Sequence, residues 1–174
     1  MTDTRFVAQL NTQIGNEFAA HQQYLAVAIY YDSLTMPQMA SFFYQQAREE
    51  RDHAMMMIRY LLDTDAAVEI PQTPAPISTF ADVVAPIELA VAQEREVTEQ
   101  IHTLARIARE EVDFAAEQFM QWFIKEQVEE VSTMQDLLAI VERNRDDLDD
   151  IESYVEREQG AGGADPTAPP VADA

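Results

Sequence analysis

The sequence predicts an all-α protein: a four-helix bundle with a long crossover between its second and third helices and a short fifth helix at the C-terminal end. Three observations support this fold class. The 174-residue chain has only four glycines, and three of them lie after residue 159, so the residues that hairpins need are almost absent before it. Four long segments carry apolar residues at the alternating spacing of three and four that bundle helices show. Prolines gather between the second and third of these segments.

The first two predicted helices form an antiparallel pair joined by a tight turn. Apolar periodicity predicts one helix over residues 5–32 and another over residues 37–62. We predict that Thr35 caps the second helix and that Pro37 occupies its first turn, where proline is tolerated.

Residues 63–82 lack helical periodicity, and Pro71, Pro74 and Pro76 would break any helix there. At about 3.3 Å per residue, the extended segment is long enough to return along the whole preceding helix. We therefore predict a crossover to the far end of the bundle. The third helix is predicted to begin between residues 83 and 86, and to end near residue 109.

The fourth predicted helix covers residues 113–143, and Asp146 and Asp147 then open a short amphipathic helix. After residue 159 the chain is mostly glycine, alanine, proline and aspartate, which predicts a disordered tail over residues 160–174. Residues 1–159 are thus predicted to form one bundle domain.

Composition excludes several classes of function. With 32 acidic and 11 basic residues, the formal net charge is −21, so we expect no nucleic-acid partner. The chain has no cysteine, which excludes disulfides, thiolate nucleophiles and iron–sulfur clusters. No segment is long and apolar enough for a signal sequence or a membrane span, so we expect a cytoplasmic, soluble protein without a membrane partner.

Ionisable or amide side chains interrupt each apolar helix face near the middle of its helix. These interruptions are Glu17 on the first helix, Glu50 and His53 on the second, Glu94 on the third, and Gln127 and Glu130 on the fourth. Because they share one height, a bundle brings them together. No lysine or arginine occupies these faces to neutralise four buried carboxylates, so a cation has to come from outside. Oxygen ligands with one imidazole suit iron, manganese or zinc.

The same sequence supplies a control for this interpretation. Glu99 and His102 repeat the Glu-x-x-His spacing of Glu50 and His53, but they fall off the face that carries Glu94. We therefore predict that the second pair lies on the surface. An isolated Glu-x-x-His pair is usually solvated, so the match in phase and height, and not the motif, carries the metal-site prediction.

Other residues next to the converging set have two readings each. Glu49, Glu126 and Glu129 adjoin it and would lie at its edge, as a further metal position or as a solvated acidic face. Tyr24 lies two turns after Glu17, where a phenol is able to hydrogen-bond a ligand or supply an electron, or simply to pack in the core.

Assembled in this way, residues 5–158 resemble the bacterial non-haem ferritins. The resemblance rests on four segments: NEFAAHQQY (16–24), EERDHA (49–54), QERE (93–96) and QFMQWFIKEQVEEV (118–131). It implies ligands for a di-iron centre: Glu17, Glu50 and His53 for the first iron, Glu94 with bridging Glu50 for the second, and Gln127 close by. It also implies a third iron site built from Glu49, Glu126, Glu129 and Glu130, with Tyr24 as a neighbour of the iron pair.

The resemblance further implies ferroxidase activity: oxidation of Fe(II) by dioxygen or hydrogen peroxide, followed by ferric mineral storage in a homo-oligomeric shell of 24 subunits. No haem is expected. Bacterioferritins carry Glu-x-x-His on the fourth helix where this chain has Gln127 and Glu130, and Asp52 stands in place of their haem-ligating methionine. Two alternatives stay open, namely a soluble di-iron oxidase or peroxidase without storage, and an acidic helical interaction module with a structural metal.

Overall fold

The computed structural model describes residues 4–158 and 165–173, and these residues contain helices but no strands. The helices in chain order are α1 (Arg5–Ser33), α2 (Pro37–Asp63), α3 (Ala85–Glu110), α4 (Phe114–Arg143) and α5 (Leu148–Glu158). The predicted all-α class, the order of the helices and the short fifth helix are therefore confirmed.

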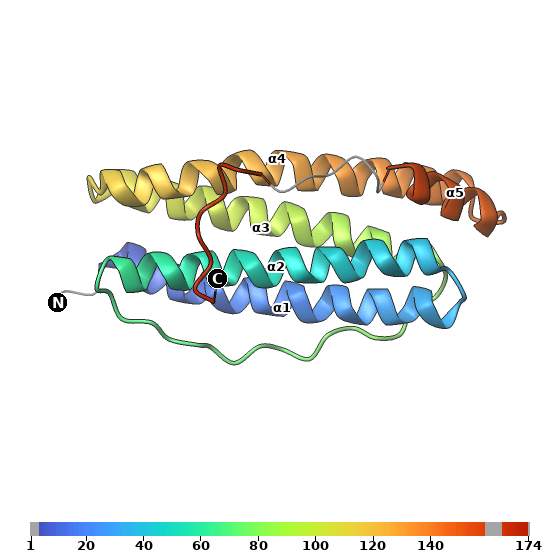
Figure 1. The fold of residues 1–174 in the computed structure, drawn as a ribbon, viewed down its shortest axis with the longest axis horizontal. Helices are drawn as coiled ribbons and strands as arrows, with labels where there is room; N and C mark the ends of the chain where they lie inside the picture. Colours follow the sequence, from blue (N-terminus) through green and yellow to red (C-terminus); the bar gives the residue numbers. More distant parts are fainter. Residues whose placement is uncertain (1–3, 159–164, 174) are drawn as a thin grey trace.

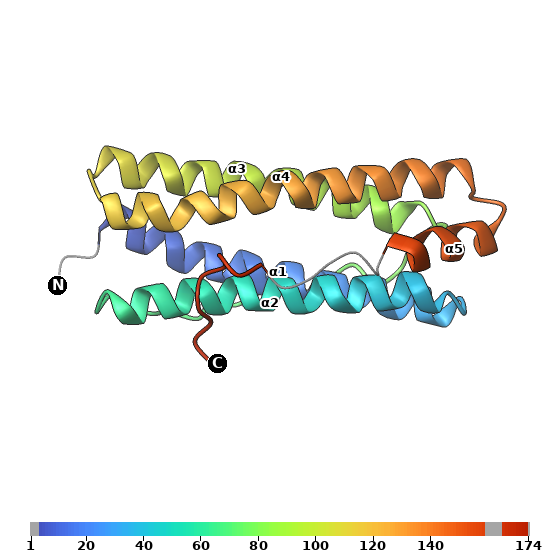
Figure 2. The ribbon, with the colours of Figure 1, turned by 45° about the horizontal axis from the view of Figure 1, so that its top comes forward.

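The four long helices form two antiparallel pairs, α1 with α2 and α3 with α4 (Figure 1). The pairs pack together through α1 and α3, and α5 folds back against α2 at one end of the bundle (Figure 2). Residues 64–84 form the predicted crossover, which runs in extended form along α1 from one end of the bundle to the other (Figure 1).

Two amide side chains of α1 fix this crossover. Asn11 accepts a hydrogen bond from the backbone N–H of Glu69 at 2.7 Å and donates to the carbonyl of Ala67 at 2.9 Å. Gln23 donates a hydrogen bond to the carbonyl of Ile77 at 2.8 Å and accepts one from the backbone N–H of Ile77 at 2.9 Å. Between these ties the crossover approaches the helix at Gly15, where an added Cβ would lie 2.9 Å from Cγ of Pro71. Glycine is thus required at position 15 by close packing.

The start of α2 is capped differently from the prediction. Thr35 has a φ of 59° in the turn before the helix, Met36 is the N-cap residue, and no side chain within the turn caps the helix, so the predicted Thr35 cap is wrong. Instead, the Glu152 carboxylate on α5 accepts hydrogen bonds from the N–H groups of Gln38 and Met39 at 2.8 and 2.9 Å. A carboxylate at a helix N-terminus also stabilises the helix dipole.

The interior consists of two apolar clusters with a polar layer between them. One cluster lies toward the α5 end and includes Tyr31, Phe43 and Ile87. The other lies toward the opposite end and includes Phe6 and Met120. Each cluster draws on all four long helices, so the bundle is closed by apolar packing above and below its polar middle.

Part of the C-terminal segment lies against the bundle. Of the predicted disordered tail, residues 160–164 and 174 lie outside the described residues. Asp165 bonds Trp122 and Lys125 of α4, and Ala172 donates to the carbonyl of Met55 on α2 at 3.2 Å. Ala168 and Val171 pack on the second apolar cluster, so residues 165–173 have more to pack than their composition indicates. The domain division at residue 159 stays a prediction.

None of the helices in the described part of the chain is both long and apolar enough to cross a membrane.

Candidate metal centre

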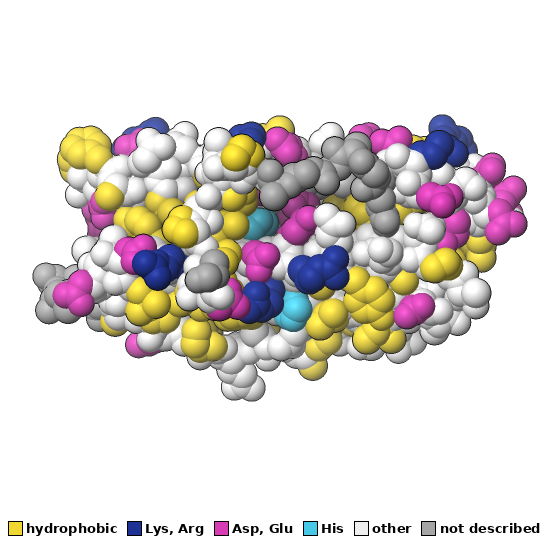
Figure 3. Space-filling view, in the orientation of Figure 1, with side chains coloured by type: hydrophobic (Ala, Val, Ile, Leu, Met, Phe, Trp, Pro, Cys, Tyr) yellow, Lys and Arg dark blue, Asp and Glu magenta, His cyan; other side chains and the backbone are white. Residues whose placement is uncertain are grey.

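The polar layer in the middle of the bundle contains the residues that interrupt the apolar faces. All four long helices contribute to it, and six of its side chains are at most 5% exposed: Glu17, Glu50, His53, Glu94, Gln127 and Glu130. Figure 3 shows acidic and histidine side chains in the middle of the face formed by α2 and α4, with hydrophobic side chains on either side. The structure therefore brings the predicted residues to one height.

Three of these side chains approach one another closely. Nδ1 of His53 lies 3.4 Å from Oε2 of Glu50 and 3.8 Å from Oε2 of Glu17. One ligand atom from each residue lies within 4.8 Å of the others, a spacing suitable for binding a single metal ion. Glu50 and His53 are one helical turn apart on α2, and Glu17 reaches them from α1.

Glu94 is buried on the α3 side of the layer and is tied to Tyr24. The Tyr24 hydroxyl donates a short hydrogen bond to Oε1 of Glu94, and Tyr24 itself is fully buried. The phenol therefore holds one oxygen of the Glu94 carboxylate. This contact agrees with the first of the two readings of Tyr24, in which its hydroxyl hydrogen-bonds a candidate metal ligand.

The α4 side of the layer consists of Gln127 and Glu130. The Thr98 hydroxyl on α3 lies 3.0 Å from Oε1 of Gln127 and 2.8 Å from the carbonyl of Glu94. Thr98 thus links the backbone beside Glu94 to the amide on the neighbouring helix. Sequence reasoning missed this contact, although Thr98 lies one turn after Glu94 on the same helix.

Burial and the neighbouring charges shift the pKa values of the ionisable groups in the layer. Burial raises the pKa of Glu94 to about 7 despite the Tyr24 hydrogen bond, and burial and the neighbouring Glu94 raise the pKa of Glu50 well above its ordinary value. Burial opposes protonation of His53, but Glu17 and Glu50 raise its pKa overall. At Glu17 burial favours the neutral form, but the attraction of His53 outweighs it and lowers the pKa.

Several buried oxygen atoms have no hydrogen-bond partner among the described residues. One oxygen of each of three carboxylates is in this state: Oε2 of Glu17, Glu50 and Glu94. Buried carboxylate oxygens without partners are costly, and no lysine or arginine is buried in the described part of the chain. A divalent cation would satisfy these oxygens, and the donor set of carboxylates with one imidazole fits iron.

The three neighbouring glutamates lie next to the buried residues of the layer and are less buried than those residues. Glu49 and Glu126 are half-buried and Glu129 is exposed. Glu49 accepts hydrogen bonds from the amides of Gln45 and Gln46. Burial and then the negative charges of Glu129 and Glu49 raise the pKa of Glu126, so both of these carboxylates lie near Glu126. Their arrangement leads from the buried layer toward the surface between α2 and α4.

Trp122 on α4 contacts the cluster. Its ring lies 5.6 Å from the His53 ring in an edge-to-face arrangement, and its Nε1 donates to Oδ2 of Asp165 at 3.1 Å. Trp122 thus joins the C-terminal segment to a candidate ligand. The sequence did not predict this contact, because the contact depends on where the C-terminal segment lies.

A bundle with a long crossover and inward carboxylates from all its helices has the architecture of the carboxylate-rich four-helix-bundle metalloproteins. A family profile described as a ferritin-like domain matches residues 7–144. The chain belongs to the ferritin family.

Relatives and solved structures agree with this assignment. The chain is 52% identical over 167 residues to ferritin BfrB of Mycolicibacterium smegmatis, covering 96% of this chain and 92% of the relative. It is 35% identical over 161 residues to a bacterial non-heme ferritin of Staphylococcus aureus, covering 92% and 96%. An open pore ferritin from Archaeoglobus fulgidus superposes with a TM-score of 0.84 at 29% identity, covering 88% of this chain and 94% of that one.

Proposed function

We propose that this protein stores iron and that its buried layer is a ferroxidase centre, which oxidises Fe(II) to Fe(III) before the ferric product is deposited as mineral. The observation that carries the proposal is the buried cluster of Glu17, Glu50 and His53, together with the carboxylate oxygens of Glu17, Glu50 and Glu94 that have no hydrogen-bond partner among the described residues. Membership of the ferritin family supports iron as the metal.

The residues divide between two Fe(II) positions. Glu17, Glu50 and His53 hold the first iron, and Glu94 holds the second together with a bridging Glu50. Gln127 lies next to the second position as a neutral ligand. Each Fe(II) gives one electron to dioxygen or hydrogen peroxide, and the negative carboxylates stabilise the more highly charged Fe(III) product.

Glu49, Glu126, Glu129 and Glu130 form a third iron position in this proposal. Their graded exposure, from buried Glu130 to exposed Glu129, supports a path that takes iron from the centre toward the surface of α2 and α4. Tyr24 positions Glu94 through its hydrogen bond and is close enough to supply an electron to the second iron.

Storage requires a cavity, so we propose a cytoplasmic shell of 24 identical subunits, with ferritin structural relatives as support. With a formal charge of −21 per chain, such a shell would concentrate cations.

Aerobic titration of the purified, iron-free protein with ferrous salt tests the proposal. We expect oxygen consumption, several hundred irons retained per shell and electron-dense cores in electron microscopy. Rapid oxidation with retention of only a few irons per chain would favour the di-iron oxidase alternative. Absence of oxygen consumption would favour the interaction module, and a stable monomer of 19.7 kDa in sedimentation would exclude shell storage.

A further inference from the structure

We propose that Gln13 is a positioning residue for the metal centre, which holds one oxygen of Glu17 so that only the other oxygen is presented to the metal. This inference rests on the proposed function and assigns a role to a residue outside the ligand set.

Gln13 lies one turn before Glu17 on α1 and is fully buried. Its Nε2 donates to Oε1 of Glu17 at 2.9 Å. The other oxygen, Oε2, has no hydrogen-bond partner and faces His53 at 3.8 Å. The two oxygens of one carboxylate are thus in different states, one satisfied by the protein and one left for a cation.

The orientation of the Gln13 amide is fixed by two further residues. Asn16 Nδ2 donates to Oε1 of Gln13 at 3.0 Å, and Gln13 Nε2 also donates to Oε1 of Gln100 on α3 at 3.0 Å. A flipped amide would lose all three bonds, because its oxygen would then face two acceptors and its nitrogen would face a donor. The amide therefore presents its donor side to Glu17.

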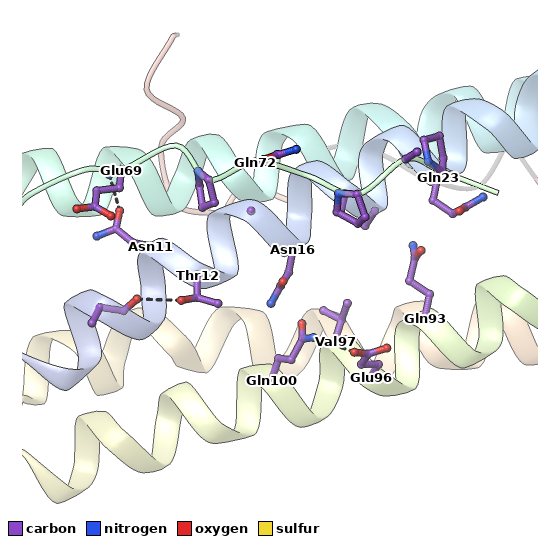
Figure 4. A pocket seen from close by; sticks show the side chains of 18 residues that line it. Asn11, Thr12, Asn16, Gln23, Glu69, Gln72, Gln93, Glu96, Val97 and Gln100 are labelled. Atoms are coloured by element: carbon purple, nitrogen blue, oxygen red, sulfur yellow. Dashed lines mark hydrogen bonds between the residues drawn. The ribbon is translucent and has the colours of Figure 1, made fainter. Parts of the chain in front are cut away.

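The supporting residues lie at a groove between α1, α3 and the crossover. Figure 4 shows Asn16 on α1 and Gln100 on α3 pointing toward each other across this groove, whose volume is about 560 Å³. Gln13 is hydrogen-bonded to both of them and to Glu17, so it connects the groove to the metal layer. The chain of amides thus runs from the groove wall to a single carboxylate oxygen.

A carboxylate held by one oxygen binds metal through the other, which favours monodentate over bidentate ligation. Hydrogen-bond partners of metal ligands commonly change metal affinity or activity by about 10–100-fold when they are removed. Gln13 should therefore affect the position that Glu17 serves and leave the position that Glu94 serves unchanged.

The test measures binding of Co(II), which suits these ligands and is not oxidised by air, to the assembled iron-free protein by calorimetry and visible absorption. We expect Gln13→Met to bind Co(II) about tenfold more weakly at one of two positions, with the other unchanged. In ferrous oxidation, the Fe(II) concentration for half-maximal rate should rise more than the maximal rate falls.

Gln93→Met is the matched control. Gln93 also lines the groove, and its buried Nε2 has no hydrogen-bond partner among the described residues, so losing this amide removes no bond. Co(II) binding by this variant should equal that of the wild type. Asn16→Ala removes a bond to Gln13 without opening the core, and we expect a loss of about threefold.

A purely structural role would lower the unfolding temperature of Gln13→Met while leaving its Co(II) affinity unchanged, and that result overturns the inference. If Gln13→Met does not assemble, Asn16→Ala decides, because unchanged Co(II) affinity in that variant also overturns it. A wild-type protein that binds no Co(II) contradicts the proposed metal centre itself, so the two failures are distinguishable.

Discussion

Two Glu-x-x-His pairs in this chain have the same spacing and opposite environments. Glu50 and His53 on α2 are 1% and 3% exposed and lie among carboxylates from the other helices. Glu99 and His102 on α3 are both exposed, as the sequence predicts. The difference is one of phase, because the first pair lies on the buried face of its helix and the second pair does not. A motif therefore gains chemical meaning from the face on which it lies.

Substitution of the two glutamates tests the comparison with the largest expected effect. Glu50→Ala should slow Fe(II) oxidation by at least about a hundredfold, because it removes the ligand shared by both metal positions. The bundle should still fold, since removing one of several buried like charges relieves repulsion. Stopped-flow absorption of the ferric product measures the rate.

Glu99→Ala serves as the control for this experiment. We expect the oxidation rate to stay within about twofold of the wild type, and stability to change by less than about 0.5 kcal/mol. Oxidation at the wild-type rate in Glu50→Ala, or a collapse of activity in Glu99→Ala, would reverse the roles of the two pairs.

The metal-free protein should lose stability as pH rises. Burial raises the pKa of Glu94 to about 7 from an ordinary value of 4.5, and the pKa of Glu50 and of Glu130 is raised in the same direction. Between about pH 4.5 and pH 7 the folded state keeps a proton that the unfolded chain has released, so the free energy of unfolding falls with rising pH. Glu94 alone contributes on the order of 3 kcal/mol to this change.

Denaturant unfolding of iron-free protein at pH 5 and pH 8 measures this effect. Glu94→Gln should flatten the pH dependence, whereas Glu99→Gln, whose side chain is exposed, should leave it as in the wild type. Saturating Co(II) should restore stability at pH 8. Greater stability of the metal-free wild type at pH 8 than at pH 5 would contradict the proposed electrostatics of the buried layer.

The smallest expected effect concerns the surroundings of His53, which include the tail through Trp122. Asp165→Asn removes the negative charge that accepts hydrogen bonds from Trp122 and Lys125, and should change stability only slightly because these contacts are exposed to solvent. Trp122 is the only tryptophan in the chain, so its fluorescence emission should shift to longer wavelength as the tail separates.

His102→Ala is a suitable control for the tail experiment, since its side chain is exposed on α3 and it should leave the emission unchanged. An unchanged spectrum in Asp165→Asn would mean that Asp165 does not hold the tail at Trp122.

Local sequence patterns were sufficient to predict the helices and the residues of the polar layer. Glycine scarcity, apolar spacing and the prolines of the crossover act within single segments, so they are visible without coordinates. The shared position of Glu17, Glu50 and Glu94 along the bundle axis could be predicted from the lengths of the helices alone.

The features that could not be predicted depend on contacts between distant segments. Glu152 caps α2 from α5, and Asp165 reaches Trp122 from beyond the last helix. The direction of the Gln13 amide depends on Gln100, which lies 87 residues away in the chain. Which group donates and which accepts at these three contacts is set by the packing of distant segments against one another, so the sequence alone does not give it.

The way the crossover is fastened has a consequence for protein engineering. Because Asn11 and Gln23 bind backbone groups, the ties depend little on which side chains the crossover itself carries. The close approach of Pro71 to Gly15 restricts the stretch between the two ties. If the chain were opened near residues 72–75, the hydrogen bonds of Asn11 and those of Gln23 would lie on opposite sides of the break, so both would be kept. This stretch is therefore a rational place for circular permutation or for inserting a foreign peptide.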